Sequence, residues 1–310
     1  MIESNCREHR NLIATIVVTY NRKDLLLECV EALLSQTEKC FDILIIDNAS
    51  TDNTFEALQK YIEEKRVLYY NIGKNTGGAG GFNYGIKKAY ELGYVYFWLM
   101  DDDTIPEKTA LQELIKADSK LQGHYGFLSS YVEWIDGSIC EMNVPARVDD
   151  IDSFPGYHEK TIIPIKTATF VSFFVQREMV EKVGLPIKEF FIWCDDTNYC
   201  IRISNFDCGY WITDSVVIHK MKVNAWSNLV YDNTDRLPRY VFEYRNQYYN
   251  ARLTRELGQY YWRVIKRVGR ICITSKDRKL LRIKYMLQGV WQGLFFNPSV
   301  EYVQTKQEII

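Results

Sequence analysis

Strand-like and helix-like runs alternate along the first hundred residues, and this order limits the chain to few folds. The β-rich runs cover residues 14–20, 41–47, 67–71 and 94–100, and the helical runs cover 23–36, 53–65 and 82–92. A β-α-β-α-β-α-β order calls for a parallel sheet with helices on both faces. We therefore expect an α/β fold that binds its ligands beyond the carboxyl ends of the strands.

The fourth predicted strand ends in an acidic cluster. Its apolar run, residues 97–100, is followed directly by Asp101, Asp102 and Asp103. Three carboxylates at the end of a core strand cost stability unless a positive group binds there. A divalent cation that carries a diphosphate meets this need, because hard cations take carboxylate oxygens and complete their shell with phosphates. An acidic surface turn is the alternative. The other predicted strands also end in polar side chains, at residues 19–22, Asp47 with Asn48, and Asn71.

Composition excludes several classes of protein. The 310 residues include 38 Lys or Arg against 40 Asp or Glu, so nothing in the overall charge favours a nucleic-acid partner. The eight cysteines include no CxxC pair, which argues against a zinc ribbon and a thioredoxin motif and favours a reducing compartment. The apolar run 12–20 is too short for a secretory signal, and no run is long enough to cross a bilayer. We expect a cytoplasmic protein, either soluble or peripheral at the inner membrane face.

A glycine-rich stretch covers residues 75–83, with the sequence NTGGAGGFN. It lacks the Lys-Ser/Thr of a Walker loop and does not fit G-x-G-x-x-G in any register. Its backbone can still approach a ligand closely and present amide donors at a helix start. A flexible turn is the other interpretation.

A second pair of carboxylates, Asp195 and Asp196, follows an aromatic segment that contains Trp193. One of them can serve as a helix cap, which leaves the other to act as a general base. His219 is a lone histidine after a strand-like run, and such residues are most often structural. Beside a carboxylate cluster it becomes a candidate metal ligand, since mixed imidazole and carboxylate shells suit manganese.

The rest of the chain is harder to interpret. Residues 125–164 contain turns and short strand-like pieces, and further runs predict a strand over 167–176, helices over 177–183 and 195–205, and a strand over 210–213. From Pro238 onward the pattern is helical, so we expect a catalytic domain over 1–225 and a helical, basic region over 226–310. Arg245 is a candidate phosphate contact or a surface ion pair. Basic and apolar residues interleave over 263–284, as in an amphipathic helix on an anionic membrane or in an ordinary solvated helix.

The order of these motifs resembles the inverting glycosyltransferases of family 2, which have the GT-A fold. The matching pieces are residues 17–22, residues 45–50, the glycine-rich stretch, residues 101–103 as the DXD motif, and the pair at 195–196. The resemblance covers about residues 13–220, and it looks closest to the galactofuranosyltransferase and rhamnosyltransferase branch. It implies a mostly parallel central sheet flanked by helices.

The resemblance also implies roles for individual residues. Asp196 would be the catalytic base, with Asp195 as its neighbour. Asp103, Asp101 and His219 would hold Mn²⁺ or Mg²⁺. The residues that would bind the nucleotide sugar are Thr19, Tyr20, Arg22, Asp47, Asn75, Gly78, Asp101 and Asp102, and Trp193 and Arg245 would contact the acceptor.

The sequence therefore predicts a metal-dependent inverting hexosyltransferase of bacterial surface polysaccharide synthesis. We expect it to transfer galactofuranose from UDP-galactofuranose to a lipid-linked glycan, with dTDP-rhamnose as the alternative donor. A nucleotidyltransferase would need a basic glycine-rich phosphate loop near the N-terminus, which this chain lacks. A non-catalytic scaffold would have no reason to hold mutually repelling carboxylates in one cleft. The acceptor, the linkage and the oligomeric state stay open.

Overall fold

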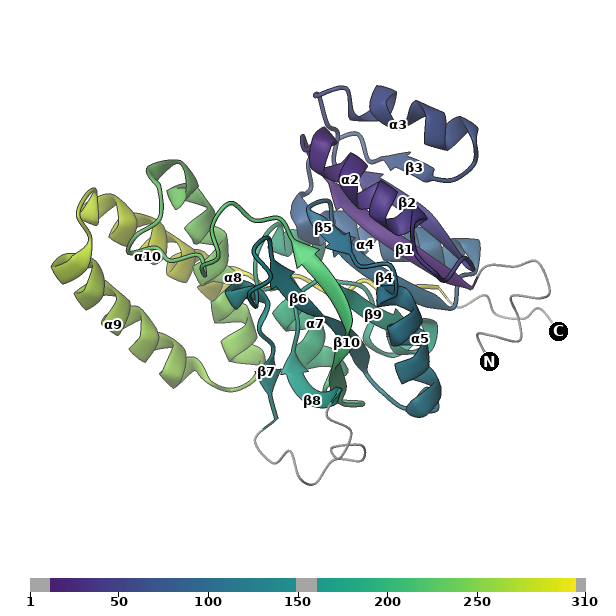
Figure 1. Ribbon diagram of the computed structural model, residues 1–310. Helices are drawn as coiled ribbons and strands as arrows, with labels where there is room; N and C mark the ends of the chain where they lie inside the picture. The colour runs from purple at the N-terminus through teal and green to yellow at the C-terminus, as the bar shows by residue number, and fades with distance from the viewer. Residues whose placement is uncertain (1–11, 149–160, 305–310) are drawn as a thin grey trace.

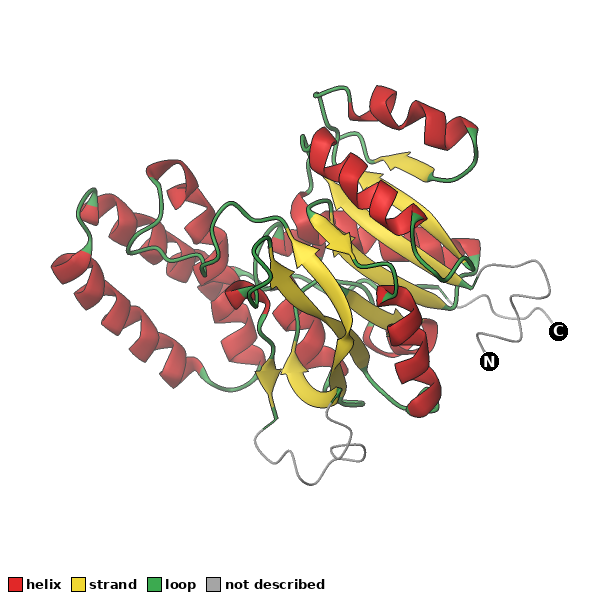
Figure 2. Cartoon of the chain, in the orientation of Figure 1, coloured by secondary structure: helices red, strands yellow, loops and turns green. Residues whose placement is uncertain are grey.

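The computed structural model describes residues 12–148 and 161–304, and its core is one ten-stranded sheet (Figures 1 and 2). The strand order is β3-β2-β1-β4-β9-β6-β10-β8-β7, and β5 pairs with β10. The strands are β1 (Ile13–Thr19), β2 (Phe41–Asp47), β3 (Leu68–Asn71), β4 (Tyr96–Asp101), β5 (Thr104–Pro106), β6 (Phe127–Trp134), β7 (Ala146–Arg147), β8 (Ile162–Thr167), β9 (Phe173–Gln176) and β10 (Gly209–His219).

The two halves of the sheet differ in strand direction. Strands β3, β2, β1 and β4 are all parallel, as the alternation of elements predicts. Strand β9 then lies antiparallel between β4 and β6, and β8 and β5 are antiparallel to β10. The expectation of a mostly parallel sheet therefore holds for the N-terminal half. The single strand predicted over 167–176 is wrong, because its residues are divided between the end of β8 and β9.

Helices cover both faces of the sheet. Apolar side chains of α2 (Lys23–Leu34), α3 (Thr54–Glu63) and α5 (Ala110–Lys120) pack in one core cluster with the odd-numbered residues of β1, such as Ile13 and Val17. Those of α4 (Gly77–Leu92), α6 (Arg177–Val183) and α7 (Asp195–Ile203) pack with the even-numbered residues, such as Ile16. The alternation follows from the two-residue period of a strand, and it explains why β1 is apolar throughout.

The glycine-rich stretch forms the first turns of α4, so the helix start predicted at residue 82 is wrong. Several glycines serve packing. A Cβ at Gly81 would lie 2.4 Å from Val18 Cγ1, and one at Gly85 would lie 2.5 Å from Ile16 Cγ2. The glycines let the helix lie directly on β1, whereas the position of a Cβ at Gly78 is open. This corrects the view of the stretch as a flexible loop.

The C-terminal helices α8 (Tyr240–Leu253), α9 (Leu257–Thr274) and α10 (Lys279–Phe295) lie to one side of the sheet (Figure 1). They have a core of their own, in which Tyr240, Tyr260 and Met286 are buried. Helix α10 lies very close to α8 at Gly289 and Gly293. A side chain at either position would collide with α8, so this close approach depends on the two glycines. The basic run 263–284 is thus not one helix but two, separated by residues 275–278.

After α10 the chain returns to the sheet region. The backbone N–H of Leu185 donates to Glu301 O at 2.8 Å, and the Glu301 carboxylate pairs with Lys87 and Lys188. The division at residue 225 stays a prediction. Within the described ranges, we find no helix that combines the length and the apolar character needed to span a bilayer.

Candidate active site

The carboxyl ends of β1 and β4 lie side by side, which brings four predicted residues together. Strand pairing sets Val18 opposite Asp101, so Thr19 adjoins Asp102 and its hydroxyl donates to Asp102 Oδ2 at 2.8 Å. Arg22, just past the end of β1, donates through one guanidinium nitrogen to Asp102 Oδ1 at 3.3 Å and to Asp103 Oδ2 at 2.5 Å. The acidic strand end is therefore partly neutralised by a cation from its own sheet edge.

His219 approaches the same cluster from β10. The pairing of β5 with β10 sets His219 opposite Thr104, and this places His219 Nε2 3.2 Å from Asp103 Oδ1. The contact is within ion-pair distance but outside hydrogen-bond geometry, so the buried Oδ1 has no hydrogen-bond donor. Two residues that lie more than one hundred positions apart in the sequence thus share one site.

The other ring nitrogen of His219 is held by a side chain that the sequence did not single out. Nδ1 lies 2.8 Å from Asn143 Oδ1, and Asn143 Nδ2 donates to Thr169 Oγ1 at 2.7 Å. The bond to Thr169 orients the amide so that its oxygen accepts from Nδ1. In a neutral ring this keeps the proton on Nδ1 and leaves the Nε2 lone pair facing Asp103.

Burial and mutual repulsion shift the acidity of the cluster. Burial, with the Asp103 charge, raises the pKa of Asp101 to about 7, and burial raises the pKa of Asp102 to about 6 against the opposing Arg22. Burial also acts to raise the pKa of Asp103, but the contacts with His219 and Arg22 lower it below its usual range. Burial alone would lower the pKa of His219, yet the adjacent Asp103 raises it to about 10. Added positive charge would therefore stabilise the ionised carboxylates of this cluster.

The described residues contain no group of three or more His, Cys, Asp or Glu side chains already arranged around a metal position. The chemistry of the donors nevertheless fits a divalent cation. Asp103 Oδ1 is a buried oxygen without a hydrogen bond, and the imidazole of His219 faces it. Carboxylate oxygens with one imidazole suit Mn²⁺, and Asp101 adds a further carboxylate whose ionisation a cation would favour.

The ends of β2 and β3 supply a second polar group. Asp47 is buried, and its carboxylate accepts from the Ser50 backbone N–H at 2.8 Å and from the Tyr69 hydroxyl. Among the other predicted nucleotide contacts, Tyr20 is exposed, and Asn75 Oδ1 accepts from the Gly77 N–H at 2.8 Å. Asn48 links this edge to α4, since its Oδ1 accepts from the Thr76 hydroxyl at 2.9 Å.

The second carboxylate pair begins α7. Burial and the Asp196 charge raise the pKa of Asp195 well above its usual range, and burial raises the pKa of Asp196 to about 6. Asp196 is half-buried, while Asp195 is buried and senses the charge of Asp101. Asp196 is therefore the more accessible of the two carboxylates, and its raised pKa lies in the range that suits a general base.

The backbone before this pair is strained. Phe191, Trp193 and Cys194 have positive φ angles of 64°, 65° and 65°, which non-glycine residues rarely adopt. Asn246 of α8, which is fully buried, holds the segment because its Nδ2 donates to the carbonyls of residues 190, 192 and 193 at 3.0, 3.1 and 2.9 Å. Asn250 Nδ2 donates to Cys194 O at 3.2 Å. We call Asn246 and Asn250 the α8 clamp.

The two predicted acceptor residues lie beside this segment. Arg245 donates to the carbonyls of Glu189 and Phe190 at 2.7 and 3.1 Å, and burial lowers its pKa to about 10. Trp193 packs against Tyr240, with the ring centroids 5.1 Å apart. The sequence analysis missed Asn246 and Asn143. The spacing of Asn246 and Asn250, four residues apart on one face of a polar and aromatic helix, was the available signal for the clamp.

Comparisons with known proteins show sequence similarity to glycosyltransferases. The sequence model of glycosyl transferase family 2 matches residues 15–124. An uncharacterized glycosyltransferase of Rickettsia felis is 38% identical over 104 residues, which are 34% of this chain and 17% of that protein. Galactofuranosyltransferase GlfT1 of Mycolicibacterium smegmatis is 23% identical over 210 residues, 63% of this chain and 66% of that protein. An Escherichia coli protein, UDP-Glc:alpha-D-GlcNAc-diphosphoundecaprenol beta-1,3-glucosyltransferase WfaP, is 31% identical over 122 residues, 39% of this chain and 47% of that protein.

Solved structures show the same fold at low sequence identity. GalNAc-T7 with UDP, GalNAc and Mn²⁺ superposes with a TM-score of 0.58 at 15% identity, over 77% of this chain and 52% of that one. The mannosyltransferase PcManGT from Pyrobaculum calidifontis, in complex with GDP-Man and Mn²⁺, gives a TM-score of 0.57 at 13% identity, over 93% and 88%. The predicted GT-A fold is thereby confirmed.

Proposed function

We propose that the chain is an inverting, metal-dependent hexosyltransferase, and the match of residues 15–124 to the sequence model of glycosyl transferase family 2 supports this. The observation that carries the proposal is the proximity of two acidic groups. Asp101, Asp102 and Asp103 follow β4, and the Asp195–Asp196 pair begins α7, close enough for Asp101 to raise the pKa of Asp195. One group suits a diphosphate with its cation, and the other suits proton transfer.

The donor would bind across the ends of β1, β2 and β4. Thr19, Arg22 and Asp102 form a hydrogen-bonded unit there, and Asp47 is buried at the end of the neighbouring strand. Arg22 can release a carboxylate and contact a phosphate instead, because its side chain is 51% exposed. Tyr20 directly follows β1, and Asn75 lies in the connection between β3 and α4; both belong to the set that we propose for the nucleotide. Gly78, whose Cβ position is open, would let the backbone approach the donor.

Asp103, His219 and Asp101 would hold the cation, which we propose to be Mn²⁺ or Mg²⁺. When bound, it would stabilise the negative charge of the nucleoside diphosphate leaving group. Asn143 supports this role, since it orients His219 with Nε2 toward Asp103.

Asp196 would act as the base. It would take the proton from an acceptor hydroxyl as that oxygen attacks the anomeric carbon on the face opposite the diphosphate. The new glycosidic bond forms as the bond to the diphosphate breaks, so one displacement inverts the configuration. Burial and the Asp196 charge raise the pKa of Asp195 well above its usual range, and its protonated form would limit repulsion beside Asp196.

We propose UDP-galactofuranose as the donor and a lipid-linked glycan as the acceptor, in bacterial surface polysaccharide synthesis. The match to GlfT1 supports the sugar, and the match to WfaP supports a diphospholipid acceptor. The matches cover 66% of GlfT1 and 47% of WfaP. We also propose residues 1–225 as the catalytic domain and 226–310 as a region that contacts acceptor or membrane, with Trp193 and Arg245 nearest the acceptor.

Calorimetric titration with UDP and dTDP, with and without Mn²⁺, tests the donor site. We expect Mn²⁺-dependent binding that prefers UDP, and we expect Asp103→Ala to remove the Mn²⁺ dependence. A preference for dTDP would move the donor to rhamnose. Binding that is equal with and without Mn²⁺ would show that Asp103 and His219 hold no cation there.

A further inference from the structure

Helices α9 and α10 each carry a second apolar stripe that the protein leaves exposed. On α9 the stripe contains Trp262, Ile265 and Ile273, with 56%, 61% and 85% of their surface exposed. These residues lie on a different side of the helix from Val264 and Ile271, which are buried in the core of the C-terminal helices. An ordinary surface helix has one apolar face, so a second one indicates a partner.

Helix α10 repeats this arrangement. Leu280, Leu287 and Leu294, each seven residues apart, are 85%, 50% and 41% exposed, while Met286 on the other side is buried. Trp291 and Phe295 extend the stripe, at 64% and 72% exposure. Both helices turn their buried faces toward the core that they share with α8, so the two stripes lie on the outer side of the α9–α10 hairpin.

The same hairpin concentrates positive charge. Residues 257–300 carry nine Lys or Arg and one acidic residue, Asp277, in a chain whose net charge is −2. The buried Arg282 pairs with Asp277, which cancels the one acidic charge. The basic residues that are exposed are Arg263, Lys266, Arg270, Lys276, Arg278, Lys279 and Lys284. A surface that is both apolar and cationic is complementary to anionic lipid, because Lys and Arg can reach the headgroups while Trp and Leu enter the acyl boundary.

We propose that the α9–α10 hairpin docks on an anionic lipid bilayer. This inference rests on the proposed function, whose lipid-linked acceptor would be reached from that surface. Charge also argues against a second copy of the chain as the occupant. Pairing the leucine stripes of two hairpins would bring two strongly cationic segments together, and like charges at an interface oppose association.

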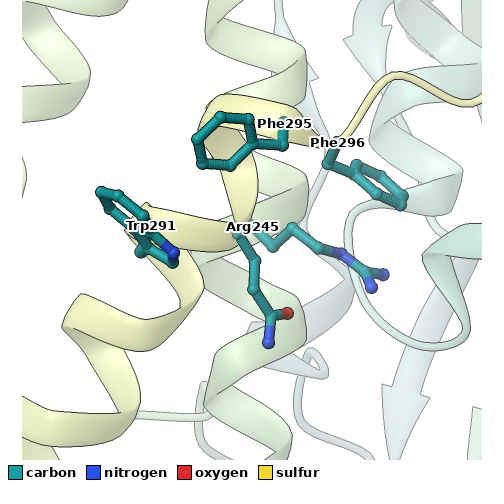
Figure 3. A pocket seen from close by; sticks show the side chains of 5 residues that line it. Arg245, Trp291, Phe295 and Phe296 are labelled. Atoms are coloured by element: carbon teal, nitrogen blue, oxygen red, sulfur yellow. The ribbon is translucent and has the colours of Figure 1, made fainter.

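The end of α10 lies beside the segment that leads to Asp196 of the proposed active site. A hollow of about 340 Å³ is lined by Arg245 of α8 and by Trp291, Gln292, Phe295 and Phe296 at the end of α10 (Figure 3). The Arg245 guanidinium lies 4.0 Å from the centre of the Phe296 ring and also donates to the carbonyls of Glu189 and Phe190. Docking through α10 would therefore place the segment that leads to Asp196 next to the lipid surface.

Vesicle flotation tests the proposal. We expect the full chain to float with vesicles that contain phosphatidylglycerol, to bind phosphatidylcholine vesicles weakly, and to lose binding as salt rises. Each basic residue near an anionic surface strengthens partitioning by about fivefold. Lys266→Glu with Arg270→Glu should therefore lower partitioning by roughly 25-fold or more. Leu280→Gln with Leu287→Gln should lower it by on the order of tenfold.

Matched controls separate this surface from general effects. Phe206→Gln removes an aromatic side chain that is 58% exposed outside the hairpin, and Lys60→Glu reverses a charge on α3, so neither should change partitioning. Wild-type binding no stronger to phosphatidylglycerol than to phosphatidylcholine would overturn the proposal. A dimer in analytical ultracentrifugation that Leu287→Gln dissociates would assign the face to a second copy. UDP titration without vesicles tests the proposed function separately, and the hairpin variants should leave it unchanged.

Discussion

Substitution of Asn246 tests whether the structure holds the proposed base, Asp196, in position. Its side-chain amide is fully buried and donates to three carbonyls of the strained segment before Asp195. Asn246→Ala removes both N–H donors, so the carbonyls of residues 192 and 193 lose their Asn246 partner, whereas Phe190 O keeps the Arg245 N–H. Each unsatisfied acceptor costs about 1–3 kcal/mol. With two donors lost, we expect the free energy of unfolding to fall by roughly 2–6 kcal/mol.

The effect on catalysis should be separate from the effect on donor binding. Without the clamp, Phe191, Trp193 and Cys194 can relax from positive φ, and Asp196 moves with them. A displacement of about 1 Å in a catalytic group can cost on the order of 100-fold in rate. We therefore expect kcat to fall by about that factor while the Kd for UDP changes by less than about threefold, since Thr19, Arg22 and Asp47 lie on other elements.

The assays are urea unfolding, steady-state transfer from a UDP-sugar below the unfolding transition, and UDP titration. Gln247→Ala is the matched control, because Gln247 is the next residue of α8 and donates to Glu243 rather than to the strained segment. If Asn246→Ala lowers stability as expected but keeps wild-type kcat, the clamp is structural only and the reasoning fails. An equal loss of UDP affinity would refute it as well.

Three further predictions follow from single sites. Asp196→Asn should abolish transfer but keep UDP affinity, as measured by turnover and calorimetry. Burial raises the pKa of Glu243 to about 7, so the folded state binds its proton more tightly than the unfolded state, and stability falls as pH rises from about 4.5 to 7. Glu243→Gln should therefore raise the free energy of unfolding at pH 8 by roughly 1–3 kcal/mol and leave it unchanged at pH 4.5. Gly81→Ala should lower stability by about 1–3 kcal/mol relative to Gly78→Ala, since only the first meets Val18, whereas Gly78→Ala should weaken donor binding alone.

Each of these has an outcome that would contradict it. Residual transfer by Asp196→Asn above about 1% of wild type would move the base elsewhere. If the unfolding free energy of the wild type falls no more between pH 4.5 and 7 than that of Glu243→Gln, the buried Glu243 carboxylate does not destabilise the fold. Equal stability of Gly78→Ala and Gly81→Ala would show that α4 can move away from β1.

The local sequence pattern was enough to predict the strands of the N-terminal half of the fold and their parallel order. The runs that became β1, β2, β3 and β4 are apolar and end in polar side chains, and a parallel order follows from the helices between them. Thr19, Arg22, Asp102 and Asp103 were selected for this reason, since carboxyl ends of parallel strands meet at one edge. The start of α4 was missed because glycine has low helix propensity, and here close packing on β1 outweighs that cost.

The sequence by itself determined the candidate groups of the proposed site: an acidic strand end, a second carboxylate pair and one histidine. Tertiary structure alone decided that Asn143 orients His219 and that Asn246 holds the backbone before Asp195, because these contacts join elements that no local pattern relates. It also decided which apolar residues of α9 and α10 stay exposed, since helical spacing marks two stripes and only packing against α8 buries one of them. The spacing of apolar residues shows which side chains a helix can bury, but the fold decides which neighbouring elements bury them.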